Sequence, residues 1–125
     1  MIRYPLLPLA ALLAACAGTP APIATFVQGK GSPALETGVQ QFENGQYTEA
    51  TRSLQSALDL GLNVANDRAR AHKYLAFIHC ASSRLPQCRD QFSRALDAAP
   101  AMELEPSEIG HPVWGPAFKT VKARR

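Results

Sequence analysis

Three cysteines and three histidines are the side chains of this sequence whose types could support metal, redox or nucleophilic chemistry. His72 and His79 are seven positions apart, so they would share one face of a helix, and His111 could join them as a third metal ligand. No carboxylate or cysteine stands beside them at a typical ligand spacing. We therefore expect structural or solvated histidines and no metal site.

Cys80 and Cys88 are the pair on which a redox activity would depend. Seven residues separate them, which is far from the C-x-x-C arrangement that tunes a reactive thiolate. The sequence also lacks the G-x-S-x-G of a hydrolase nucleophile, and residues 29–32 (GKGS) lack the upstream glycine of a phosphate-binding loop. We expect neither enzymatic activity nor a cofactor.

The length of the chain indicates one small domain, and its charge does not favour nucleic-acid binding. The chain has 125 residues, 46% of them hydrophobic, which is ordinary for a single globular domain. The net charge is +3, and without Arg3, which lies in a segment that we expect to be removed, 12 basic against 10 acidic residues leave +2. This charge is too weak and too dispersed to indicate nucleic-acid binding.

The first 15 residues have the anatomy of a secretory signal, with one basic residue followed by an apolar run over residues 6–15. That run is too short to span a bilayer of about 30 Å as a retained helix. Its end, L-A-A-C at residues 13–16, resembles a bacterial lipobox, in which the signal is cut before the cysteine and Cys16 is lipidated. The alternative is an uncleaved or ordinarily cleaved signal with a chance cysteine.

The lipoprotein resemblance implies acyl chains on Cys16, and more than one chain is what stable anchoring requires. No Asp follows Cys16, which by the family's usual sorting rule favours the outer membrane, facing the periplasm. Residues 16–31 are rich in Ala, Gly, Thr and Pro and are predicted to form a tether that reaches on the order of 50 Å.

In an oxidising periplasm, Cys80 and Cys88 are left to pair with each other. Each is a few residues from a predicted turn at Ser82 and Ser83, between antiparallel helices, so their Cα atoms can approach to a bonding distance. We predict a disulfide, with two buried free thiols as the alternative.

Apolar periodicity and turn residues predict two helix pairs, residues 32–62 and 70–100, that align without a gap when shifted by 38 positions. The aligned positions are Tyr47 with Leu85, Ala50 with Cys88, Leu54 with Phe92, Ala57 with Ala95 and Leu58 with Leu96. Ser32 is the predicted cap of the first helix, Asn66 or Asp67 of the third, and a last helix is predicted from about Pro116.

The G-Q-Y-T-E-A turn at residues 45–50, the Cys88-x3-Phe92 spacing and the closing Pro100 resemble the tetratricopeptide family. The resemblance implies an all-α solenoid of two helix hairpins, at about residues 32–64 and 67–101, within a domain over residues 32–125. A capping segment, residues 102–125, would close it. Two repeats are fewer than such arrays usually need, so the disulfide, the cap or homodimerisation would have to supply stability.

In that family the first helix of each repeat lines a concave groove. Alignment places six candidate partner-binding residues there: Leu35, Val39, Phe42, Arg70, Lys73 and Phe77. Such a surface would suit an extended peptide or an acidic helix. The alternative is that the apolar three are covered by the tether or belong to the core, and that Arg70 and Lys73 are solvated.

The C-terminal tail is a second candidate contact surface. Residues 104–118 carry the only Trp and three of the ten prolines, and the candidate partner-binding residues are His111, Trp114 and Phe118. Phe118 and Val121 are expected to cap the last repeat. The basic residues at the end, Lys119, Lys122, Arg124 and Arg125, are expected to complement the helix dipole, with anionic headgroups or an acidic partner as the alternative.

The lipobox, the K-Y-L-A-F-I-x-C run and the G-H-P-V-W-G-P-x-F tail together resemble small tetratricopeptide lipoproteins associated with bacterial type VI secretion systems. The resemblance implies a protein-binding assembly accessory in the periplasm. The runner-up is a pilotin-like lipoprotein that sorts a secretin or other client to the outer membrane. Cell-wall binding is a third alternative, which only the basic tail favours.

Overall fold

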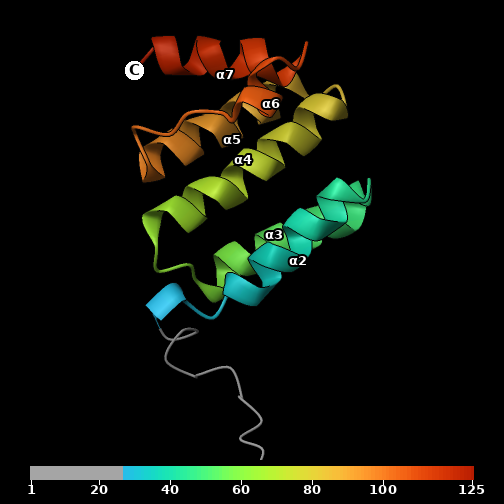
Figure 1. The fold of residues 1–125 in the computed structure, drawn as a ribbon, viewed down its shortest axis with the longest axis vertical. Coiled ribbons are helices and arrows are strands. Elements are labelled where there is room, and N and C mark those ends of the chain that lie inside the picture. The colour runs from blue at the N-terminus through green and yellow to red at the C-terminus, as the bar shows by residue number, and fades with distance from the viewer. Residues whose placement is uncertain (1–26) are drawn as a thin grey trace, which may run out of the picture.

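The computed structural model describes residues 27–125, which form helices that stack on one another in chain order (Figure 1). The helices are α2 (Ser32–Glu43), α3 (Tyr47–Leu60), α4 (Ala65–Ala81), α5 (Leu85–Ala98), α6 (Pro106–Ile109) and α7 (Trp114–Ala123). No strand occurs between residues 27 and 125, so the predicted all-α class is confirmed. The predicted signal peptide, Cys16 and the tether up to residue 26 lie outside the described residues.

The four longest helices form two antiparallel pairs that coincide after a shift of 38 positions, except that α4 begins five residues earlier than the shift from α2 would place it. α2 ends at Glu43 and α4 at Ala81, while α3 spans Tyr47–Leu60 and α5 spans Leu85–Ala98. The turns also match: the N–H of Gln46 donates to the carbonyl of Gln41 at 2.8 Å, and the N–H of Arg84 donates to that of His79 at 2.8 Å.

Equivalent positions of the two pairs are buried alike. Ala50 and Leu54 of α3 are fully buried, as are Cys88 and Phe92, their counterparts in α5. The small side chains of Ala50 and Cys88 let the paired helices approach closely. Leu54 and Phe92 fill the space between the helices. The hydrophobic residues predicted to face inward in α3 and α5 therefore build the core.

The core consists of two joined clusters. The first lies between the two helix pairs and contains Leu35, Val39, Leu54, Leu62, Leu75 and Ile78 among its larger members. The second lies between the second pair and the C-terminal segment and contains Phe77, Phe92, Leu96, Leu104 and Phe118. Phe42 and Tyr74 pack against both clusters and connect them.

The last residues of the predicted tether belong to the folded unit. Gly31 N–H donates to the carbonyl of Gly61 at 2.8 Å, and Asn63 N–H donates to that of Gln28 at 2.9 Å. A Cβ atom on Gly31 would lie 2.0 Å from the carbonyl oxygen of Ala57, so only glycine allows this approach. The chain is thus fixed to the loop between the two helix pairs before α2 begins.

The helix starts also differ from the sequence-based expectation. Gly31, not Ser32, is the cap of α2, and the Ser32 hydroxyl donates to the Gln28 side chain at 3.2 Å instead. α4 begins at Ala65, ahead of Asn66 and Asp67. Asp67 then lies in the first turn, where its carboxylate faces the positive end of the helix dipole.

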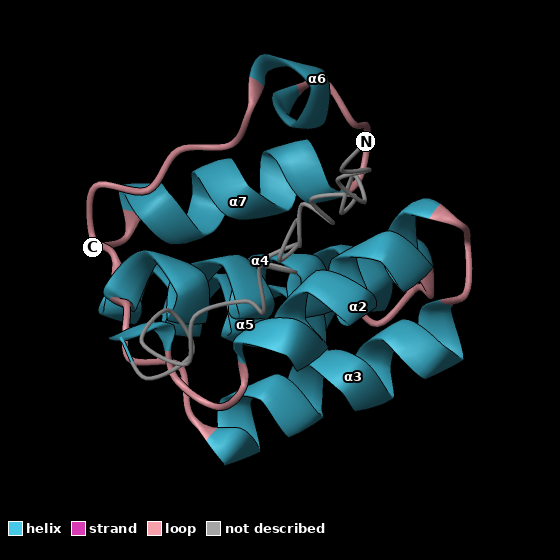
Figure 2. Ribbon diagram, turned by 60° about the horizontal axis from the view of Figure 1, so that its bottom comes forward, coloured by secondary structure: helices cyan, strands magenta, loops and turns pink. Residues whose placement is uncertain are grey.

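The C-terminal segment returns across the second helix pair (Figure 2). α7 packs mainly on α5 and also reaches α4. It begins at Trp114, two residues before Pro116, where the sequence predicted its start. The short helix α6 precedes it and begins with a capping box. The Glu105 side chain accepts a hydrogen bond from the backbone N–H of Glu108, and the Glu108 side chain accepts one from the backbone N–H of Glu105.

Candidate interaction site

The residues predicted to line a concave groove lie close together, but the face they form is not open. Leu35 and Val39 are buried in the first core cluster and Phe77 in the second, while Phe42 is half-buried between them. The apolar floor predicted for a partner is therefore part of the protein's own core.

Trp114 covers this face. Its indole ring stacks on Phe77, with ring centroids 4.3 Å apart and planes inclined by 23°, and it lies 6.3 Å from the ring of Phe42. Stacked aromatic pairs at this distance contribute beyond the area that they bury. The C-terminal segment fills the space where a partner was expected.

An ion pair fixes the same segment at α6. The ammonium group of Lys73 lies 3.0 Å from the Glu108 carboxylate, and the two side chains are only 12% and 14% exposed. The carbonyl of Glu108 accepts a hydrogen bond from Trp114 Nε1 at 2.9 Å. Lys73 was expected to be solvated or to bind a partner, but it is already paired within the chain.

Arg70 is half-buried, and its side chain is 35% exposed. Its guanidinium pairs with Glu36 of α2 and joins the two helix pairs. Partial burial opposes the charge on Arg70, but the hydrogen bond and negative charge of Glu36 outweigh it and leave the pKa of Arg70 raised. An acidic partner at this point would have to compete with Glu36.

The three tail candidates have different environments. His111 Nδ1 accepts hydrogen bonds from the N–H groups of Val113 and Trp114 at 3.1 and 3.2 Å, and its ring stacks on Trp114. Both rings are half-buried. Phe118 is fully buried against Phe92, with ring centroids 5.3 Å apart, and so caps the second pair as predicted.

The predicted disulfide is present. Cys80 near the end of α4 is bonded to Cys88 in the first turn of α5, and their Cα atoms lie 5.1 Å apart. Both cysteines are buried in the second core cluster. The bond therefore clamps the turn between the helices of the second pair and has no accessible sulfur for exchange chemistry.

The histidines do not meet at a common point. His72 Nδ1 is 2.7 Å from the Gln91 side chain, and His79 Nδ1 accepts a hydrogen bond from Arg84 Nε at 2.9 Å. Within residues 27–125, no group of three or more His, Cys, Asp or Glu side chains could hold a metal ion. In the same range, no helix is long and apolar enough to cross a membrane.

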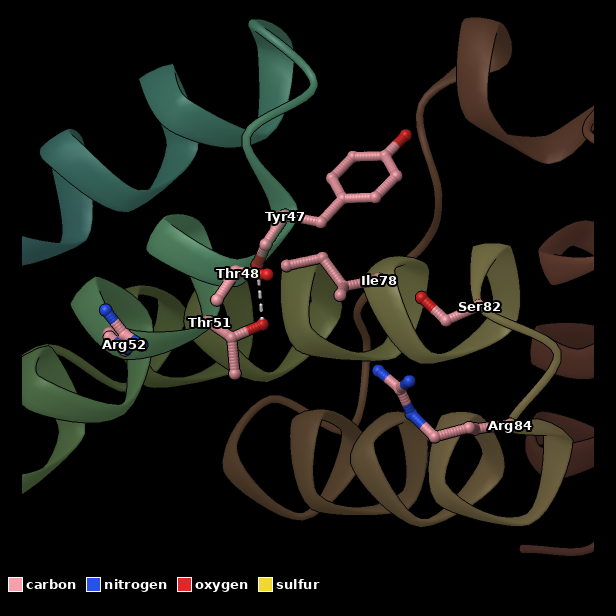
Figure 3. A pocket seen from close by; sticks show the side chains of 7 residues that line it. All are labelled: Tyr47, Thr48, Thr51, Arg52, Ile78, Ser82 and Arg84. Carbon is pink, nitrogen blue, oxygen red and sulfur yellow. Dashed lines mark hydrogen bonds between the residues drawn. The ribbon is translucent and has the colours of Figure 1, made fainter.

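A pocket that the sequence did not predict lies between the start of α3 and the turn that follows α4 (Figure 3). Its volume is about 330 Å³, and it is lined by Tyr47, Thr48, Thr51, Arg52, Ile78, Ser82 and Arg84. On α3 these residues have the i, i+1, i+4, i+5 spacing of one helix face. This polar face could have indicated the pocket, but the prediction for this helix used only its apolar face.

The described residues define an all-helical protein built from stacked antiparallel helix pairs with a C-terminal cap. Comparisons of the chain with protein-family profiles, with curated proteins and with solved structures found no match. Interpretation of the site therefore depends on its residues and their geometry.

Proposed function

We propose that this chain is a lipoprotein of the tetratricopeptide type, anchored through Cys16 to the outer membrane and facing the periplasm, that binds other envelope proteins. Its action is attachment and presentation, without catalysis. In the leading version it is an assembly accessory of a secretion apparatus of the type VI class, on the sequence resemblance described above.

The observation that carries the protein-binding proposal is the equivalence of the two helix pairs. Gly45 and Ser83 occupy the same place in the two turns, and both have a positive φ, 76° and 59°. Ala57 and Ala95 are both fully buried at the equivalent place in α3 and α5. Repetition of a helix hairpin with the same turn and the same small residues supports the tetratricopeptide type, whose members act through their surfaces.

Because the predicted groove is covered, we expect partners to bind other surfaces of the protein. Trp114 and Glu108 already fill the face that includes Phe77 and Lys73. A partner is therefore more readily bound elsewhere, and the exposed surface available at the tail includes Val113, which is 43% exposed, next to the half-buried His111 and Trp114.

Anchoring is tested by cell fractionation of variants expressed in the native envelope. Cys16→Ser should release the protein from the membrane fraction, because the acyl chains would have no acceptor, while Ala17→Ser serves as the matched control and should stay bound. Persistence of Cys16→Ser in the membrane would place the anchor elsewhere.

Cross-linking of the wild-type lipoprotein in intact cells, followed by mass spectrometry, identifies what it holds. Stoichiometric recovery of secretion-apparatus components supports the accessory. A deletion strain with mislocalised secretin rings, and no such complex, would instead support the pilotin-like alternative.

A further inference from the structure

The pocket between α3 and the α4–α5 turn collects positive charge without a matching carboxylate. Its lining includes Arg52 and Arg84 and no acidic residue. The ion pairs found within residues 27–125 engage other cations, namely Arg70, Lys73, Arg94, Lys122 and Arg125. Two guanidinium groups therefore border one cavity with no anion of their own.

Two hydrogen bonds to His79 hold Arg84 in position. Its backbone N–H donates to the carbonyl of His79 at 2.8 Å, and its Nε donates to the His79 ring at 2.9 Å. These bonds leave the two terminal nitrogens of the guanidinium without a hydrogen bond to any described residue. Figure 3 shows Arg84 extending from the turn toward Ile78, across the pocket from Tyr47. A fixed planar guanidinium can bind both oxygens of a carboxylate.

The rest of the lining suits a peptide. Tyr47 is 37% exposed, and its ring stacks on Phe42 with centroids 5.4 Å apart, while the buried Ile78 forms an apolar floor. The Thr51 hydroxyl donates to the carbonyl of Tyr47 at 2.8 Å. The hydroxyls of Thr48 and Ser82 bond to no described residue, so they can donate to or accept from a peptide backbone.

We propose that this pocket binds a short peptide segment of a partner protein that carries a carboxylate next to an apolar side chain. Arg84 binds the carboxylate, and Arg52 adds positive charge at the other side of the pocket. Tyr47 and Ile78 contact the apolar side chain, and Thr48 and Ser82 bond the backbone. The cavity of about 330 Å³ is at the lower end of the range of ligand pockets, which fits a segment of a few residues. The inference rests on the proposed protein-binding function and names the chemistry of the partner.

The direct test uses a fluorescein-labelled Gly-Asp-Phe-Asp-Gly peptide as the probe and Gly-Asn-Phe-Asn-Gly as its matched control. Binding to the full-length protein in detergent micelles is followed by fluorescence anisotropy. The acidic probe should bind and the amide probe should not. Arg84→Gln should weaken binding by about tenfold, the effect of losing one charge-assisted hydrogen bond, and Arg52→Gln should weaken it by a smaller factor.

Arg89→Gln is the control variant, because Arg89 is an exposed arginine on α5 that lies outside this pocket and outside the ion pairs. It should change the affinity less than about twofold. Helix content by circular dichroism should be unchanged in all three variants. Absence of binding by the acidic probe at 1 mM, as an order-of-magnitude limit for weak peptide recognition, or equal binding to the Arg52, Arg84 and Arg89 variants, would overturn the site.

A second measurement separates this site from the proposed function. A photo-cross-linking residue at Thr48 should capture, in intact cells, a partner segment that contains Asp or Glu beside an apolar residue, and Arg84→Gln should abolish the capture. If whole-cell cross-linking recovers a partner that the Thr48 probe never touches, the function stands and the pocket assignment is wrong. If no partner is recovered by either route, the proposed function itself fails.

Discussion

The indole ring of Trp114 and the phenyl ring of Phe77 lie nearly parallel, with centroids 4.3 Å apart, and this contact joins the C-terminal segment to the middle of α4. Phe77 is 1% exposed as a result. The surface that a partner was expected to occupy is thereby converted into core.

Replacing Trp114 with alanine should lower the free energy of unfolding by about 3 kcal/mol, because it removes a large aromatic side chain and uncovers Phe77. Urea unfolding followed by circular dichroism measures the change. Val113→Ala is the matched control, since Val113 is 43% exposed and its loss should cost under about 0.5 kcal/mol. Equal stabilities of the two variants would show that α6 and α7 do not hold this face closed.

The Lys73–Glu108 pair should behave as a coupled unit. Lys73→Met and Glu108→Gln should each destabilise the fold by about 1–3 kcal/mol, because each leaves one poorly solvated group unpaired. The double variant should lose less than the sum of the two single changes, which a double-mutant cycle measures.

Asp90 and Arg94 supply the control for that cycle, because their side chains are 56% and 58% exposed. An exposed pair of this kind is expected to couple by about 0.5 kcal/mol or less. Coupling of Lys73 with Glu108 no larger than this would mean that water screens the pair fully.

The disulfide should stabilise the second helix pair. Closing a loop of this length contributes roughly 2.5 kcal/mol in the chain-entropy model, so the protein should lose about that amount in dithiothreitol. Thermal unfolding with and without the reductant tests this. The Cys80→Ala/Cys88→Ala protein should not respond to the reductant, and iodoacetamide labelling of the unreduced wild type should find no reactive thiol at either position.

Glycine should be the more stable residue at the equivalent position of both turns. Ser83 has φ 59°, a region that costs a residue with a Cβ roughly 1 kcal/mol, so Ser83→Gly should stabilise the protein by up to about that amount. Gly45 has φ 76°, and Gly45→Ser should destabilise it by a similar amount. Urea midpoints of the two variants give the signs, and a loss of stability in Ser83→Gly would contradict the equivalence of the turns.

Acidification should destabilise the protein through His79. Partial burial, and then the charge of Arg84, hold the pKa of His79 below its ordinary value near 6.5, while Asp90 opposes the shift. The unfolded chain therefore takes up this proton at a higher pH than the folded protein, so the stability falls as the pH drops below about 6.5. Urea midpoints between pH 7.5 and 5.5 should fall, and less so in His79→Gln, whose amide oxygen can still accept from Arg84. An identical slope in that variant would exclude His79 as the cause.

The helix pairs could be predicted from the sequence because their signals are local. Gly45 lies in the predicted turn after α2, and Gly61 directly follows α3, which spans Tyr47–Leu60 within the predicted first pair. The shared 38-residue offset then placed α5. The Cys80–Cys88 disulfide followed from the same turn geometry.

Local sequence signals could not predict that the C-terminal segment covers the predicted groove. This coverage depends on where the C-terminal segment docks. Two of its contacts join Phe77 with Trp114 and Lys73 with Glu108, residues far apart in the chain. Periodicity showed that Phe77 and Trp114 were apolar, but not that each would cover the other. The Gln28–Asn63 contact is likewise a long-range backbone interaction that no local pattern indicates.

The chain enters the folded unit at residue 27 at one end of the stack, beside α2 and α3, and α7 lies at the opposite end (Figure 1). We call the end of the stack at residue 27 the near pole and the end at α7 the far pole. Backbone hydrogen bonds from Gly31 to Gly61 and from Asn63 to Gln28 fix the near pole, so a pull on the preceding chain is carried into the joint between the two helix pairs rather than into a single helix end. With the attachment proposed above, the backbone hydrogen bonds of residues 28–31 would bear the load, and the basic C-terminal helix would lie at the end away from the attachment.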